Sequence, residues 1–200
     1  MTERRFAWCG VLAPIVFILA LLVFSALRPN YSQLTHAVSE LGVAGIPHAV
    51  AWNVIAFMLV GFLIVGLAWA LRVELQPGPA AVAVPLLTGI SGIGFVGLGV
   101  VPADPGFSPS LATSTHFAMV SVNYLAFIFT ALVFAIKLRN KPYWKPWALV
   151  SGVIGVMAVA SIFIPGTVPA GLSQRIGIGT NLAWLFVIGL ALLRKSAPVP

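Results

Sequence analysis

The chain has 200 residues, of which 60% are hydrophobic and only 8% are charged, and its mean hydropathy is +1.06. This composition excludes a soluble globular protein, because too few polar residues are present to cover a water-exposed surface. The net charge of +7 does not indicate a nucleic-acid partner, since the basic residues lie singly or in short groups between apolar stretches. We expect an integral membrane protein whose partners are membrane lipids.

Six segments are long and apolar enough to cross a hydrocarbon core about 30 Å thick, which requires roughly 20 residues per helix. They are residues 6–27, 49–71, 79–101, 116–137, 144–164 and 176–193. The first follows a basic start, as a signal peptide does, but its apolar run is too long and no small-x-small cleavage site ends it, so we interpret it as a retained span. The pattern predicts an all-α, integral membrane six-helix bundle that forms a single domain over residues 1–200.

Arginine and lysine predict the orientation of these spans. With six spans, Arg28 and Arg175 fall on one side and the other nine of the eleven basic residues on the opposite side. Because cytoplasmic loops are enriched in arginine and lysine, we expect both termini in the cytoplasm. The protein is then a multi-pass plasma-membrane protein with residues 28–48, 102–115 and 165–175 outside.

The first outer loop, RPNYSQLTHAVSELGVAGIPH, gathers polar residues that are rare elsewhere in the chain. Ser32 can cap a short amphipathic helix that ends at Gly42. The apolar positions of this helix would be Leu34, Ala37, Val38 and Leu41. His36 and Glu40 would then lie one turn apart and in contact. The same stripe could also simply face water.

The other outer loops carry ionisable residues as well. Asp104 lies between two prolines, which form a stiff turn, and His116 lies where the fourth span begins. Gln174 and Arg175 precede the sixth span. We expect Glu40, Asp104, His116 and Arg175 to form one cluster in which Arg175 contacts an acid.

Three asparagines extend this pattern into the spans. Asn53, Asn123 and Asn181 each lie within about two turns of an outer helix end. Amides in lipid need hydrogen-bond partners, so these should point into the bundle, either as contacts between helices or as the lining of a pocket that opens outward.

Two other kinds of site have partial matches in the sequence. The residues GIGFVG match a dinucleotide-binding pattern, but they lie within the third span and indicate close helix packing instead. A zinc site built from His36, His48, His116 and the two outer acids lacks any metal-binding spacing, and a haem held by His48 and His116 would require both to face each other. We expect no metal site, and the sequence identifies no cofactor.

Four segments, RPNYSQLTHAVSELG, VPADPG, STHFAMV and GLSQR followed by NLAW, carry a resemblance to a known family. They resemble the uncharacterised six-span prokaryotic membrane family known as domain of unknown function 998, over nearly the whole chain. The resemblance implies that the site residues are Arg28, Tyr31, Ser39, Glu40, Asp104, His116, Gln174 and Arg175. It matches neither His36 nor His48, and it implies no activity.

Two hypotheses for function remain open. In the first, the outward polar pocket binds a lipid headgroup or another small polar ligand, or its charges form a structural ion-pair network. The residues that would contact the ligand are Arg28, Tyr31, Gln174, Arg175 and the three asparagines. In the second, the protein is a membrane-embedded hydrolase or transferase that acts on a lipid or lipid-linked substrate. His116 would then be the general base, oriented by Asp104 or Glu40, with Ser39 or a water as nucleophile.

Overall fold

The computed structural model describes residues 2–75 and 78–195, and in these ranges the regular elements are all helical. The long helices are α1 (Thr2–Leu27), α3 (Val60–Glu74), α4 (Ala80–Val100), α5 (Leu111–Leu138), α6 (Lys145–Ser161) and α7 (Ala170–Lys195). The short ones are η1 (Val38–Gly42), α2 (Ala49–Trp52), η2 (Asn53–Leu59) and η3 (Pro105–Phe107). The elements α2, η2 and α3 run on as one helical rod, in which η2 is a stretch of wider π-helical turns.

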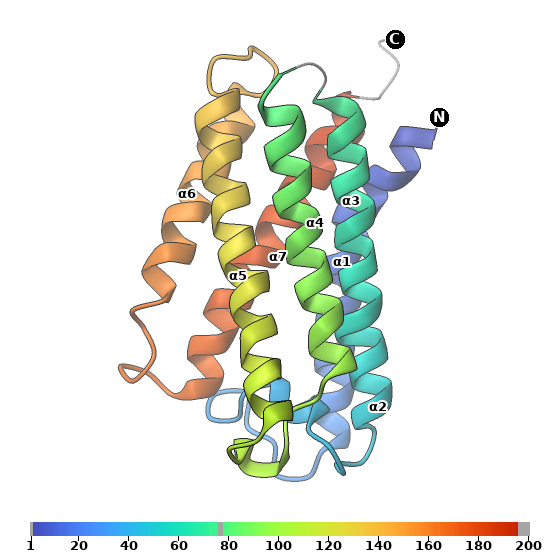
Figure 1. Ribbon diagram of the computed structural model, residues 1–200, viewed down its shortest axis with the longest axis vertical. Coiled ribbons are helices and arrows are strands. Elements are labelled where there is room, and N and C mark those ends of the chain that lie inside the picture. Colours follow the sequence, from blue (N-terminus) through green and yellow to red (C-terminus); the bar gives the residue numbers. More distant parts are fainter. Residues whose placement is uncertain (1, 76–77, 196–200) are drawn as a thin grey trace.

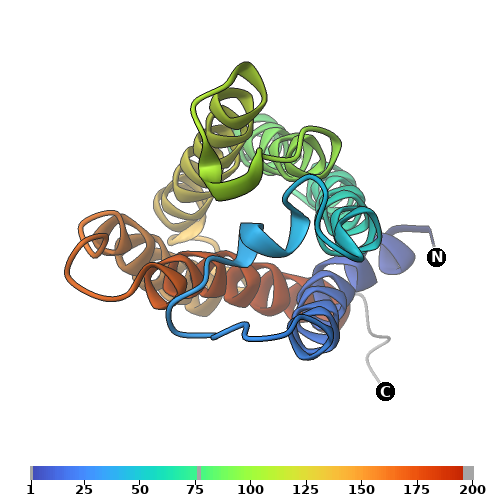
Figure 2. The same cartoon turned by 90° about the horizontal axis from the view of Figure 1, so that it is seen from below.

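The long helices form a closed ring. Neighbours along the chain pack against each other from α3 to α7, and α1 closes the ring by packing against both α3 and α7. Viewed from the end that holds residues 28–48, the ring surrounds a centre into which η1 projects (Figure 2). The start of α1 and the end of α7 lie together at the opposite end (Figure 1).

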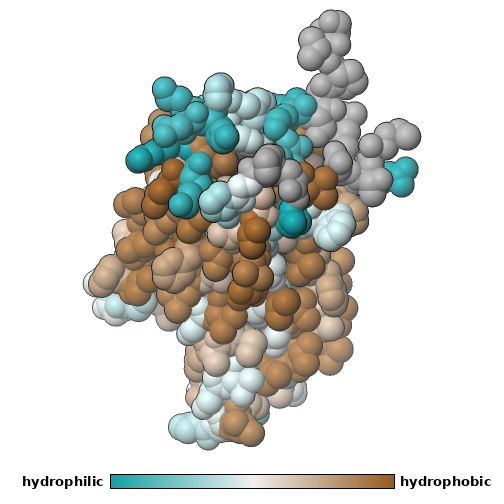
Figure 3. All heavy atoms as spheres, turned by 45° about the horizontal axis from the view of Figure 1, so that its top comes forward, coloured by the Kyte–Doolittle hydropathy of each residue, from teal (hydrophilic) through white to brown (hydrophobic). Residues whose placement is uncertain are grey.

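Five of these helical rods are long and apolar enough to cross a membrane, namely Arg5–Leu27, Ala49–Glu74, Ala80–Val100, Leu111–Leu138 and Ala170–Lys195. The helix α6 is apolar too but has only 17 residues. On the face seen in Figure 3, hydrophobic side chains form a broad belt, and hydrophilic ones collect at the end where α1 begins and α7 ends. The length and the composition of the rods, together with this belt, are those of a membrane-embedded protein.

Several helix ends differ from those that hydropathy predicts, and α7 begins at Ala170, six residues earlier than expected. The helix α5 begins at Leu111, five residues earlier than expected, because the Ser110 side chain accepts a hydrogen bond from the Thr113 backbone N–H and caps it. The helix α6 ends at Ser161, three residues early. Gly166 follows with φ +85° between Pro165 and Pro169, a sequence that cannot continue a helix.

The end of the ring that holds the two chain ends is tied together by Lys195 at the end of α7. Its ammonium pairs with Glu74 of α3 and lies 5.3 Å from the ring centre of Trp144 and 5.5 Å from that of Tyr143. These four residues come from three separate parts of the chain. Their contacts therefore hold α3, α7 and the α5–α6 turn together at this end.

Close approach of α3 and α4 depends on two glycines. A Cβ atom built on Gly92 would lie 2.9 Å from the Gly61 carbonyl oxygen, and one built on Gly61 would lie 2.7 Å from the Gly92 carbonyl oxygen. Gly89, one turn earlier on α4, has its nearest neighbour at 3.9 Å. Gly92 and Gly89 therefore differ in how closely a neighbouring helix approaches them.

Replacing Gly92 by Ala should lower the stability of the protein by about 1–3 kcal/mol, because the added methyl group pushes two backbones apart. The matched change Gly89→Ala should have little effect or raise stability slightly, since alanine favours the helix and its methyl group would only touch Ala68, at 3.9 Å. Melting temperatures of both variants in detergent test this, and equal melting temperatures would contradict it.

Candidate functional site

Residues 28–48, hereafter the roof, cover the end of the ring that lies away from the chain ends. Their centre is η1, which is buried: Val38 is 0% exposed and Leu41 3%. The predicted short helix thus does fold over the bundle with Val38 and Leu41 inward, but Leu34 remains exposed.

The roof helix is shorter than predicted, because the chain is extended at Ala37 (φ −65°, ψ 148°). Ser32 caps only a single turn, where its hydroxyl accepts hydrogen bonds from the backbone N–H groups of Leu34 and Thr35. The break at Ala37 removes the helical spacing between His36 and Glu40, so their predicted contact is wrong. The His36 Nδ1 atom instead accepts a hydrogen bond from the Ser32 backbone N–H at 3.0 Å.

Glu40 stabilises the roof from its own end. One carboxylate oxygen accepts a hydrogen bond from the Ala37 backbone N–H at 2.7 Å, and the other lies 3.8 Å from the Arg28 guanidinium. Arg28 also donates to the Glu40 backbone carbonyl at 2.7 Å. These bonds fasten η1 to the end of α1.

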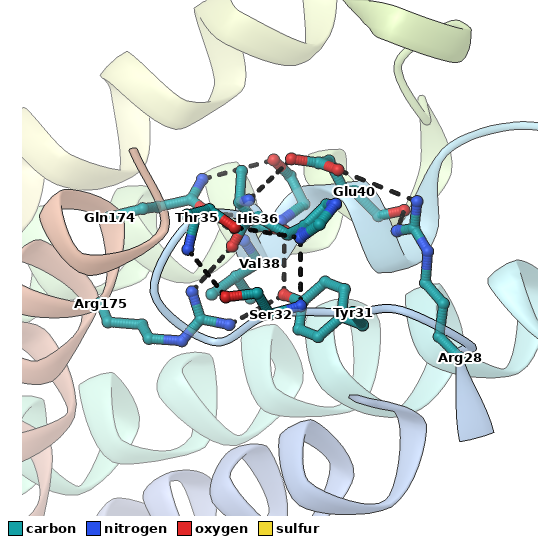
Figure 4. A network of polar contacts seen from close by, with 11 residues as sticks. Arg28, Tyr31, Ser32, Thr35, His36, Val38, Glu40, Gln174 and Arg175 are labelled. Carbon is teal, nitrogen blue, oxygen red and sulfur yellow. Dashed lines mark hydrogen bonds and ion pairs between the residues drawn. The ribbon is translucent and has the colours of Figure 1, made fainter. Parts of the chain in front are cut away.

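Arg175 binds the other side of the roof from α7 (Figure 4). It donates to the Gln33 side chain, to the Tyr31 hydroxyl and to the backbone carbonyls of His36 and Gly171, all at 2.8–2.9 Å. The structure therefore differs from the expected pairing of Arg175 with an acid. A guanidinium has five donors in a rigid fork, which suits it to several neutral oxygens at once.

Gln174, next to Arg175, supplies the hydrogen bonds that η1 lacks. Its side-chain oxygen accepts from the backbone N–H groups of Val38 and Ser39, and its amide nitrogen donates to the Ser39 hydroxyl at 3.3 Å. The first residues of a helix have no internal partner for their N–H groups. Gln174 is therefore the cap of η1, provided by a helix 135 residues away in sequence.

Tyr31 connects the two arginines. Its ring centre lies 5.5 Å from the Arg28 guanidinium carbon and 5.7 Å from that of Arg175, and its hydroxyl donates to the Ala37 carbonyl at 3.0 Å. Burial raises the pKa of Tyr31 above its usual value, although the hydrogen bond from Arg175 acts in the opposite direction. The phenol therefore stays protonated and can both donate and accept.

We expected the Asp104 carboxylate to join this network, but the hydrogen bonds of Asp104 are made by its backbone. The loop between α4 and α5 contacts the roof through backbone atoms, since Ala44 N–H donates to the Ala103 carbonyl at 3.1 Å. The Asp104 backbone N–H donates to the Thr113 hydroxyl, and its carbonyl accepts from Phe107. The proline-flanked turn thus positions the loop on α5.

A cavity of about 300 Å³ lies directly beneath the roof, at the lower end of the range typical of ligand pockets. It is lined by η1, η2, α4, α5, α7 and the end of α6, mostly through apolar side chains such as Phe57 and Phe95. The site residues predicted from the sequence that line it are Ser39, His116, Asn123 and Gln174. Arg28, Tyr31, Glu40 and Arg175 belong to the roof network, outside the cavity lining.

His116 is the most unusual group in this lining. The side chain is 2% exposed, and its Nδ1 atom lies 2.9 Å from the Val101 carbonyl oxygen. A carbonyl can only accept, so Nδ1 carries the proton and Nε2 is an acceptor. Nε2 is buried and has no hydrogen-bond partner among the described residues. Val101, rather than Asp104 or Glu40, therefore orients the imidazole.

The three asparagines are all buried, as predicted, but in different surroundings. Asn123 donates to the backbone carbonyl and the hydroxyl of Ser91, both at 2.9 Å, and so joins α5 to α4. Asn53 donates to the Gly42 carbonyl at 2.8 Å and fastens the roof to η2. Asn181 lies on α7 outside the cavity lining.

Sequence reasoning missed Tyr124 and Ser161, which also line the cavity. The Tyr124 hydroxyl donates to the Ala158 carbonyl at 3.1 Å and lies 3.4 Å from the Thr180 hydroxyl. It also bonds to Ser161, so that it joins α5 to both α6 and α7. A phenol well inside an apolar segment, next to Asn123, was the available signal.

A metal site finds no support within residues 2–75 and 78–195, where no three His, Cys, Asp or Glu side chains lie close enough to hold an ion. His48, at the start of α2 with φ 65°, is exposed and lies apart from the cavity lining.

Comparison with known proteins gives one match. The sequence model of a family described as "Protein of unknown function (DUF998)" matches residues 11–191. No curated protein and no solved structure matches the chain.

Replacing Arg175 by Lys should loosen the roof, because an ammonium cannot make the four hydrogen bonds of the guanidinium. Losing two of them, at about 1 kcal/mol each, should raise hydrogen exchange of the backbone amides in residues 31–42 at least tenfold. The same change at the exposed Arg139, near the other end of the molecule, is the control. Unchanged exchange in the Arg175 variant would show that the roof is held by other contacts.

Proposed function

The chain belongs to the DUF998 family, and we propose that it is a six-span protein of the plasma membrane that binds a small lipid-like ligand in the cavity beneath the roof. Both chain ends are cytoplasmic in this proposal, and the roof faces outward. The roof network of Arg28, Tyr31, Glu40 and Arg175 has a structural role, since its polar groups are already occupied by one another and by backbone atoms.

The proposed topology is supported by the ring arrangement and by charge. The 17 residues of α6 extend about 26 Å at 1.5 Å per residue, within the lower range for a spanning helix. Nine of the eleven basic residues belong to the end that would be cytoplasmic.

Cysteines placed at Ser108 and Thr167, both exposed, should react with a membrane-impermeant thiol reagent in intact cells. A cysteine at the exposed Lys141 should react only after the cells are permeabilised. Cys9 would be changed to Ser in all variants, because it is the free cysteine of the chain. The reverse pattern of labelling would invert the proposed orientation.

Ligand binding is supported above all by the unpartnered Nε2 atom of His116. A buried polar atom without a partner costs about 1–3 kcal/mol, and such atoms in native proteins call for an explanation. A ligand with a hydroxyl or N–H group would supply the missing hydrogen bond. The apolar walls around His116 would hold the rest of that ligand.

An enzymatic role is the second candidate, because the Ser39 hydroxyl and the free Nε2 atom of His116 line the same cavity. His116 could accept a proton there. No carboxylate orients it, however, and Ser39 is hydrogen-bonded to Gln174 rather than to His116. Binding without turnover is therefore the simpler proposal.

Replacing His116 by Phe tests the binding role, because the ring is kept while the acceptor is lost. Native mass spectrometry of protein extracted in mild detergent should show a bound small molecule on the wild type and at least tenfold less on the variant. The exposed neighbour Ser114→Ala should retain it. A wild type without any bound molecule would contradict the proposal, and a wild-type turnover of a lipid that His116→Gln abolishes without loss of stability would favour the enzyme.

A further inference from the structure

We infer that the cavity is entered sideways from the membrane, through an opening between the outer halves of α5 and α7, and that its ligand is an uncharged lipid carrying a hydroxyl group. This inference rests on the proposed binding at His116, and it adds the route and the chemical class.

The opening exists because α6 is too short to fill the space beside it. The helix α6 has 17 residues, whereas its neighbours α5 and α7 have 28 and 26. Beyond Ser161 the chain continues without helix until α7 begins at Ala170, and it loops away from the outer half of α5 (Figure 1). No helix therefore separates α5 from α7 in this half of the ring.

Hydrogen bonds define the two edges of this opening. On the side toward the middle of the membrane, the Tyr124 hydroxyl bridges α5 to α6 and α7. On the outer side, Gln174 holds η1 against α7. Between these edges the cavity lining includes Val120, Ile162 and Gly177. Ile162 is 46% exposed, so the cavity wall reaches the surface here.

Gly177 keeps the opening wide. A Cβ atom on Gly177 would lie 3.4 Å from the Tyr124 hydroxyl oxygen, so any larger side chain would project into the opening. Gly179, two residues later, has no atom within 4 Å of a built Cβ and lines a different groove, between α1 and α7. That groove meets the cavity only at Val38 and Ile178, and Val38 is fully buried.

Entry from water is blocked by the roof. The lining residues that η1 contributes, Val38 and Ser39, are 0% and 5% exposed, and their backbone N–H groups are held by Gln174. A ligand that came from the water would have to break these bonds. A ligand that came from the outer half of the membrane would pass only Val120, Ile162 and Gly177.

The lining also selects the class of ligand. It contains no Asp, Glu, Lys or Arg, so a phosphate, carboxylate or ammonium group would be buried without a counter-charge, which is costly. Its buried polar atom without a partner, His116 Nε2, accepts a hydrogen bond. A long-chain alcohol matches both conditions, because its hydroxyl donates and its chain is apolar.

Photolabelling in proteoliposomes tests the inference, with decan-1-ol that carries a diazirine on its chain as the probe. Leu98, 5% exposed in the cavity, reports entry, and the lipid-facing Phe186 reports the surrounding membrane. Excess decan-1-ol should abolish Leu98 labelling, whereas 1-methoxydecane, which lacks the donor, and decanoate, which is charged, should not. His116→Phe should reduce Leu98 labelling at least tenfold.

The route is tested with matched variants. Gly177→Leu, or Ile162→Trp if the first folds poorly, should slow Leu98 labelling at least fivefold without affecting Phe186, and Gly179→Leu should not. Slowing by Gly179→Leu alone would assign entry to the α1–α7 groove. Faster labelling in Arg175→Lys would assign entry to the roof. Either result overturns entry between α5 and α7. Equal competition by all three compounds would overturn the ligand class. Absence of Leu98 labelling in the wild type would overturn the proposed binding itself.

Discussion

The peptide groups of η1 lie inside a ring of apolar helices, where they cannot reach water. The half of the protein that holds the roof depends on how these groups are hydrogen-bonded. Gln174 provides the acceptor for Val38 and Ser39, and Asn53 provides the donor for Gly42. Arg175 occupies the carbonyl of His36. Unpaired peptide groups in such surroundings would cost several kcal/mol, so the inward fold of the roof depends on side chains such as these three, which reach it from other helices.

This dependence explains why a roof so rich in polar groups covers a cavity that is mostly apolar. The arginines and the acid form their hydrogen bonds mainly with backbone and side-chain atoms of the roof, which leaves uncharged groups to face the space below. The charged side chains of the roof and the cavity are therefore separated by a single layer of the chain, the roof backbone. The sequence, in which both sets of residues occur in the same loops, suggested one mixed pocket instead.

Hydropathy was sufficient to predict the helical architecture, because each rod coincides with an apolar segment to within a few residues. It could not predict that Ser110 extends α5 outward or that α6 stops at Ser161, since caps and proline-flanked turns act on single residues. The site was predicted in part: His116, Ser39, Asn123 and Gln174 do share a cavity. The partners of Arg175 could not be predicted, because they depend on an extended residue at Ala37 that no sequence pattern marks. The position of Asp104 depends instead on backbone hydrogen bonds to Thr113 and Phe107. Tyr124 was missed because its three partners come from two other helices.

The shortness of α6 has a further consequence for the lipids around the protein. A helix of about 26 Å set between neighbours of about 40 Å presents a shorter apolar surface than a bilayer core of about 30 Å. Lipids beside such a helix must thin or tilt to match it, at a cost of fractions of a kcal/mol per Å. In the proposed topology this mismatch falls on one side of the ring only, so the protein would carry its own local defect in the outer leaflet, and its distribution among membranes would depend on their thickness.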